Sequence, residues 1–255
     1  MAKHDQAATS RVFERACTIH VKNSPFIFLE WALFEESCGR IDEANKVYDL
    51  LEQKIPKLAL TSTRRINMNR RVGRPDEVKR LFQVAIDGSE TDQGRIFFAC
   101  KYSRYLSVVL NEIVAAKQVL EEQLKKVPSS CRLYLQLLDM EMTIKSDDLE
   151  KRVCAVLDRA IEAMEATEDQ ILFSQRKMEF LEDFGSNTQI LMECFTKHNE
   201  LLKNTASTQK TAVKTSGGPI SNENVKVSSF NDRLIGFKII ISLLAESGQV
   251  LVSCC

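Results

Sequence analysis

Glycine and proline are scarce in this chain of 255 residues, with nine and five copies. Both residues mark the many turns of β-rich folds, so their scarcity disfavours a fold of short strands. The alternating pattern of a half-buried strand is also missing, apart from the short stretch Val225-Lys226-Val227. The chain is therefore predicted to be built from helices.

The chain also lacks a charge excess and the short motifs of common enzyme sites. Its 35 basic and 35 acidic residues cancel, whereas a general polyanion-binding protein should show a basic surplus. His4, His20 and His198 are far apart, without the spacing of metal ligands, and no P-loop, GxGxxG or GxSxG motif is present. Acid pairs such as Glu35-Glu36 are predicted to be solvated. We therefore predict no enzyme, and no catalytic, cofactor-binding or metal-binding residue.

Cysteine pairs with CxxC spacing are missing as well. The eight cysteines include no CxxC pair, and Cys17, Cys100, Cys154 and Cys194 occupy apolar helical positions. This pattern favours reduced core thiols in a reducing compartment over a disulfide framework. The polar start of the chain shows no secretory signal, and the apolar run 239–245 is far shorter than the roughly 20 residues that span a bilayer. We expect no membrane association.

What the chain does contain is one helical pattern that recurs. Apolar or small residues at positions 0, +3, +4 and +7 lie on one face of a helix, and six segments carry this pattern. Their first residues are separated by 35, 34, 38, 37 and 38 positions, and they are Thr9, Ala44, Val78, Ala116, Val153 and Leu191. Gln123 and His198 loosen the match at position +7 of two segments. A period of this length accommodates a helix, a turn, a second helix and a turn.

Candidate first helices lie between these segments, at 26–38, 57–72, 92–109, 130–144 and 168–184. Residues 8–203 are therefore predicted to form an α-solenoid of one half pair and five helix pairs. Residues expected to pack between the helices or to end them are Phe13, Ala16, Trp31, Phe34, Gly39, Ala44, Tyr48, Gly73, Phe82, Tyr134, Phe173, Phe180 and Gly185. Because the array starts with a second-type helix that lacks its partner, we expect the chain to come from something longer.

The composition changes after Lys203. Residues 204–232 are rich in Ser, Thr, Asn, Lys and Gly and contain few large apolar side chains, so they are predicted to be a disordered linker. Residues 233–255 form a short apolar segment. It either docks onto the last repeat or is a poorly ordered alternative terminus.

An arginine cluster stands out in the second predicted pair, where five arginines fall within eleven residues: Arg64, Arg65, Arg70, Arg71 and Arg74. Such a cluster could hold phosphate or an acidic partner. A solvated helix face with ion pairs within and between repeats is favoured, because the five do not share one side of a helix. No aromatic residues interleave them as a single-strand RNA platform would prefer. A protein partner and RNA remain the alternatives for the first four.

Several segments resemble a known repeat family. Val12-Phe13-Glu14-Arg15-Ala16 is similar to the second-helix core of HAT (half-a-TPR) repeats, which are themselves similar to tetratricopeptide repeats. Trp31, Phe34, Glu35 and Gly39 look like the first helix of a full repeat. Over about residues 10–203, RVFERACTIH, EWALFEESCGRIDEA, LYLQLLDMEM and FSQRKMEFLEDFGS resemble the HAT array of a pre-mRNA splicing-factor family.

This resemblance implies a right-handed α-α superhelical solenoid of HAT/TPR-like pairs that serves as a nuclear, non-enzymatic scaffold. Proteins of this kind associate with protein components of the U1 small nuclear ribonucleoprotein in 5′ splice-site recognition, and their HAT arrays form homodimers. RNA contact would then be indirect rather than direct. The alternative is an RNA-binding or adaptor repeat protein in 3′-end formation or ribosome biogenesis, since the repeat itself specifies no partner.

Overall fold

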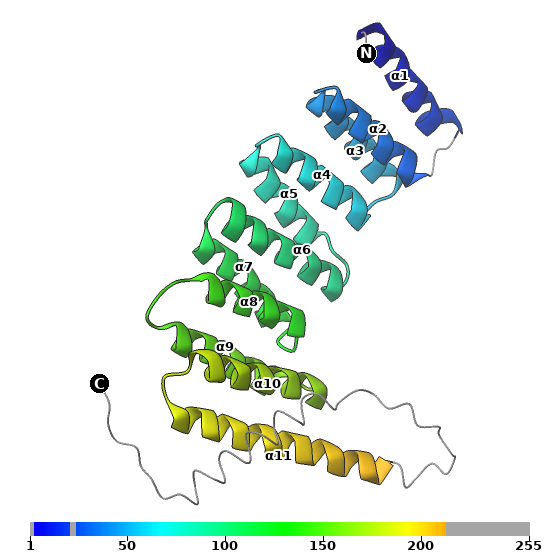
Figure 1. Ribbon diagram of the computed structural model, residues 1–255. Helices are drawn as coiled ribbons and strands as arrows, with labels where there is room; N and C mark the ends of the chain where they lie inside the picture. Colours follow the sequence, from blue (N-terminus) through cyan, green and yellow to red (C-terminus); the bar gives the residue numbers. More distant parts are fainter. Residues whose placement is uncertain (1–2, 21–23, 213–255) are drawn as a thin grey trace, which may run out of the picture. The chain divides into compact units, whose positions relative to one another are not determined.

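The computed structural model describes residues 3–20 and 24–212, and all regular structure in these ranges is helical. Figure 1 shows helices that follow one another as a stack of pairs after a single first helix. The helices up to Ala206 form one compact unit. The predicted all-α solenoid is thereby confirmed.

The single first helix is α1 (Lys3–Arg15), which continues into the π-helical turn η1 (Ala16–His20). The pairs are α2 (Pro25–Ser37) with α3 (Ile41–Lys54), α4 (Ala59–Arg71) with α5 (Pro75–Asp87), α6 (Asp92–Arg104) with α7 (Ile113–Lys126), α8 (Cys131–Thr143) with α9 (Leu149–Ala163), and α10 (Thr167–Phe184) with α11 (Thr188–Ala212). A second π-helical turn, η2 (Tyr105–Val109), extends α6. Contacts run mainly between consecutive elements, as expected for a repeat array.

The last helix reaches further than the sequence pattern indicates. α11 continues past Lys203 to Ala212, so residues 204–212 at the start of the predicted linker are helical. The rest of that linker and the predicted apolar segment 233–255 lie outside the described residues.

Two glycines end first helices with the same backbone arrangement. Gly39 and Gly73 have φ angles of 77° and 75°, the left-handed region that glycine adopts without strain. At the end of α2 the amide of Gly39 donates to the carbonyl of Glu36, and the amide of Arg40 donates to the carbonyl of Glu35, both at 2.9 Å. Gly73 closes α4 with the equivalent two bonds. These bonds satisfy the last helical carbonyls and turn the chain into the second helix.

Gly185 follows α10 differently, although it comes five residues after Phe180, as Gly39 comes five residues after Phe34. Its φ and ψ are −70° and 137°, so the backbone is extended rather than left-handed. A Cβ atom there would lie 2.4 Å from the carbonyl oxygen of Leu181, which accepts the Gly185 amide at 3.0 Å. Glycine fits this position because the backbone of Gly185 lies close to the backbone of Leu181, which leaves no room for a Cβ atom.

The core lies between successive helix pairs. Seven of the residues expected there are at most 9% exposed: Trp31, Ala44, Tyr48, Phe82, Tyr134, Phe173 and Phe180. Phe13, Ala16 and Phe34 are half-buried, and the rings of Phe13 and Phe34 pack with centroids 5.7 Å apart where α1 meets α2. Stacking of neighbouring pairs therefore removes these apolar surfaces from water.

Polar contacts link consecutive pairs at the same spacing as the sequence repeat. Three ion pairs join residues 35, 33 and 38 positions apart, and they are Arg71 with Glu36, Lys79 with Glu112, and Arg159 with Glu121. Exposed ion pairs contribute up to about 1 kcal/mol each. Because each arises only when neighbouring pairs are correctly aligned, they specify the alignment more than they stabilise the fold.

A buried carboxylate joins α1 to the first helix pair. Glu35 is only 2% exposed, so the prediction that it is solvated is wrong. It accepts hydrogen bonds from Trp31 Nε1 at 2.9 Å, Ser10 Oγ at 2.6 Å and Arg40 Nε at 2.5 Å. Burial acts to raise the pKa of Glu35, but the three donors outweigh it and lower this pKa below its ordinary value. The network thus compensates the cost of burying the charge.

Replacing Trp31 with alanine tests the core assignment. Trp31→Ala removes a buried ring and one donor to Glu35, so we expect it to lower the free energy of unfolding by about 3–5 kcal/mol. Urea denaturation measures this change. Phe26→Ala is the control, since Phe26 lies on the same helix but is 70% exposed, and it should change stability little. Equal effects of the two substitutions would contradict the assignment.

The pH dependence of stability tests the Glu35 network. Because the folded-state pKa of Glu35 is lowered, its charge stabilises the fold above its unfolded pKa of about 4.3, and this contribution disappears as pH falls through the folded pKa. We expect Glu35→Gln to destabilise the fold by about 1–3 kcal/mol near neutral pH.

Urea denaturation from neutral to acidic pH measures the difference between the parent and this variant, which should shrink toward low pH. Glu30→Gln, at an exposed position of α2, is the control and should track the parent throughout. A difference that stays constant with pH would show that the charge of Glu35 does not matter.

Candidate interaction surfaces

Chemistry-bearing side chains do not converge in the described part of the chain. Within it no three His, Cys, Asp or Glu residues are grouped so that they could hold a metal ion. His198 is 2% exposed, its Nδ1 lies 3.2 Å from Ser174 Oγ, and burial lowers its pKa. It packs in the core between α10 and α11. No described helix is long and apolar enough to cross a membrane.

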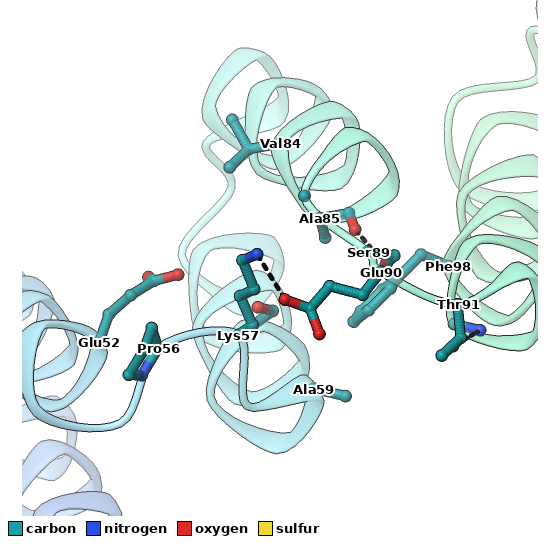
Figure 2. A pocket seen from close by; sticks show the side chains of 13 residues that line it. Glu52, Pro56, Lys57, Ala59, Val84, Ala85, Ser89, Glu90, Thr91 and Phe98 are labelled. Atoms are coloured by element: carbon teal, nitrogen blue, oxygen red, sulfur yellow. Dashed lines mark hydrogen bonds and ion pairs between the residues drawn. The ribbon is translucent and has the colours of Figure 1, made fainter.

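A cavity of about 500 Å³ lies where the turns before α4 and α6 approach each other. Figure 2 shows Lys57 and Glu90 pointing toward one another across it, and Lys57 Nζ pairs with Glu90 Oε1 at 2.7 Å. The Ser89 hydroxyl donates to a carbonyl of α5, and the Thr91 hydroxyl accepts an amide of α6 as the cap of that helix. Lys57 and Glu90 are thus engaged with each other, and the two hydroxyls with helix backbone, in a cavity that lies between two helix pairs.

The arginine cluster of α4 faces acids of the preceding pair. Three of the five arginines hold α2 or α3: Arg71 binds Glu36 with two bonds of 2.6 and 2.7 Å, Arg65 binds Asp49 at 2.6 Å, and Arg74 binds Asp42 at 3.0 Å. Three of the five arginines are therefore engaged in ion pairs between repeats. This agrees with the solvated, ion-paired helix face that helical geometry favours.

Arg64 and Arg70 are exposed, and no ion pair is recorded for either within the described ranges. They do not gather with Arg65 and Arg71 into one phosphate-sized site, because those two side chains hold separate acids. Arg70 instead lines a different surface, which it shares with the next helix pair.

This surface is a groove of about 400 Å³ between α4 and α6, which we call the α4–α6 groove. Its lining includes three cations, Arg70 of α4 and Lys101 and Arg104 of α6, and two valines, Val108 and Val109 of η2. Arg70 and Arg104 are 34 positions apart, one repeat. Because these two arginines are not neighbours in the sequence, a local sequence cluster does not reveal their grouping. A comparison of equivalent positions in consecutive repeats would reveal it.

The π-helical turn shapes one wall of the groove. The amide of Leu110 donates to the carbonyl of Tyr105 at 3.3 Å, five residues back, which widens the helix for one turn. Tyr105 and Leu106 are thereby buried, whereas Val108 and Val109 are 81% and 55% exposed. Two solvent-exposed valines thus share the groove with the three cations.

The stacked helix pairs define an α-solenoid of helical-hairpin repeats. Residues 1–71 match the family model described as the PRP39 C-terminal HAT repeat.

Pre-mRNA-processing factor 39 proteins match a longer part of the chain. The Xenopus laevis protein is 36% identical over 203 residues, covering 80% of this chain and 32% of that protein. The human protein is 34% identical over 219 residues, covering 86% and 33%. The chain is thus a helical-repeat array similar to pre-mRNA-processing factor 39, and it spans about a third of the length of these curated relatives.

Proposed function

We propose that the chain is a non-enzymatic HAT-repeat scaffold of pre-mRNA splicing that acts in the nucleus. The observation that carries this proposal is its similarity to pre-mRNA-processing factor 39 across 80–86% of its length. Association with the U1 small nuclear ribonucleoprotein in 5′ splice-site recognition is the finer part of the proposal. It rests on the resemblance of the repeats to splicing-factor HAT arrays.

The geometry supports a role in binding rather than catalysis. A stack of helix pairs presents a long surface built from equivalent positions of successive repeats, which suits simultaneous contacts with several proteins. The cavity at Lys57 and Glu90 supports this role, because that ion pair and the hydroxyls of Ser89 and Thr91 already form bonds within the chain. The working parts of the chain are therefore its exposed helix faces and the α4–α6 groove.

Proteins are favoured over RNA as the direct partners. The charges of the chain balance, and Arg65, Arg71 and Arg74 are neutralised by acids of the preceding pair. A basic excess that would attract phosphates in general is thus absent from the composition. RNA contact would then occur through partner proteins of the ribonucleoprotein. A scaffold in another RNA-processing complex is the second candidate, since the fold of helical repeats does not specify their binding partner.

Capture of U1 particles from nuclear extract tests the proposal. The chain, immobilised through a tag, is incubated with extract, and bound U1 and U2 small nuclear RNAs are quantified by reverse-transcription PCR. We expect U1 RNA to be enriched over both U2 RNA and empty resin, with Trp31→Ala losing the enrichment because its repeats loosen. Equal recovery of U1 and U2 RNA would contradict the U1 assignment, and selective recovery of 3′-end or ribosome-assembly factors would favour the second candidate.

A homodimer through the HAT array is a further part of this proposal. Its support is the similarity to splicing-factor arrays and the exposed apolar side chains of α11, where Ile190 and Met192 are 40% and 39% exposed. Light scattering of the purified chain should give twice its mass of 29.0 kDa.

The double variant Ile190→Glu/Met192→Glu should give the monomer mass, because carboxylates oppose burial in an apolar contact. Val114→Glu, at a position of α7 that is 82% exposed, should leave the dimer intact. A parent chain that is monomeric at all concentrations would refute the dimer.

A further inference from the structure

We infer that the α4–α6 groove binds a short acidic peptide segment that carries an apolar anchor and is supplied by a partner protein. The inference deepens the proposed scaffold function, on which it rests for the existence of a partner. It names the chemistry of one contact and the residues that make it.

The positive charge of the groove favours an acidic ligand. Arg70, Lys101 and Arg104 line it, and none of its nine lining residues is acidic. Among the described residues no ion pair is recorded for these three, although Arg65 and Arg71 of α4 are paired with acids. Arg104 Nε donates to the neutral Gln136 Oε1 at 2.5 Å, so its guanidinium is oriented and keeps its charge uncompensated. Three cations that line one groove without acids favour carboxylates on the partner.

The apolar part of the groove favours a ligand with an apolar side chain that can pack there. Ile66 and Phe82, which are 3% and 5% exposed, form part of its lining, while Val108 and Val109 stand exposed at its edge. The π-helical turn that carries these valines is a rare feature, and such turns recur at functional sites. A volume of about 400 Å³ is within the range of ligand pockets. A partner side chain such as leucine could therefore cover the valines and remove them from water.

Aromatic rings near the groove are not available to stack on bases. Phe82 and Tyr105 are 5% and 7% exposed. The ring of Phe97, on α6, is approached by Lys101 Nζ at 5.0 Å and by Arg132 Cζ at 5.7 Å from its centroid. Single-stranded RNA gains much of its affinity from stacking on exposed aromatic faces, so these observations favour a peptide.

Fluorescence anisotropy with a labelled synthetic peptide tests the inference on the purified full chain. The probe is an amphipathic peptide of about 15 residues, with glutamates on one face and leucines at helical spacing on the other. We expect saturable binding that weakens with added salt, and much weaker binding of the same peptide with glutamine in place of glutamate.

Matched variants locate the binding. Arg70→Gln/Lys101→Gln should weaken peptide binding about tenfold, and Val108→Ser about threefold. The controls are Lys125→Gln/Lys126→Gln, two exposed cations of α7, and Val114→Ser, whose side chain is 82% exposed compared with 81% for Val108. Both controls should bind as the parent does. Circular dichroism melting confirms that the variants remain folded, which exposed positions should allow.

Three results would overturn the inference: no binding of the acidic peptide by the parent, equal losses in the groove and control variants, or tighter binding of a single-stranded RNA oligonucleotide that is lost in the same groove variants. The last result would assign the groove to RNA. None of these measurements uses a splicing component, so the peptide can bind even if U1 capture fails, and U1 capture can succeed even if the peptide does not bind.

Discussion

A helix pair of this chain carries more apolar surface than its two helices can bury against each other. The second helix α5 illustrates this constraint, since Val78, Leu81, Phe82, Ala85 and Ile86 are all buried between its own partner and the next pair. Each pair therefore depends on its neighbours for stability. The polar links spaced one repeat apart follow from the same stacking, because it brings equivalent positions of consecutive pairs together.

The α4–α6 groove is a consequence of that stacking combined with one local irregularity. First helices of consecutive pairs lie near each other, so side chains one repeat apart in sequence line a common surface. At the end of α6 the helix widens into η2, which turns Val108 and Val109 outward. Charge and apolar surface meet there without an acidic residue in the lining. The function proposed for the chain thus belongs to surfaces between repeats, which a single repeat would not possess.

The sequence predicts the second helices well because each buries one regular stripe. The first helices are harder, because apolar side chains also lie outside the buried stripe: α2 buries Phe28, Trp31 and Ala32, whereas its Phe26 and Leu33 are 70% and 44% exposed. The burial of Glu35 was not predicted, because its donors Ser10 and Arg40 come from other segments.

Long-range contacts also limited what the sequence could indicate about the candidate site. The arginines of α4 are neighbours in sequence, but acids 16 to 35 positions away determine which of them remain unpaired. Arg70 was among the predicted contact residues, whereas Lys101, Arg104 and Val108 were missed because they lie one repeat further on. Local spacing reveals helices and their period, and only the packed pairs show which polar groups are already engaged.

We propose that surfaces between repeats, and the α4–α6 groove in particular, bind the splicing machinery. Hydrogen–deuterium exchange of the chain, free and bound to purified U1 small nuclear ribonucleoprotein, measures this binding residue by residue. We expect amides of 66–70 and 101–109 to exchange more slowly in the complex, while amides around Val114 are unchanged. A complex that leaves 66–70 and 101–109 unprotected, or the absence of any complex, would contradict it.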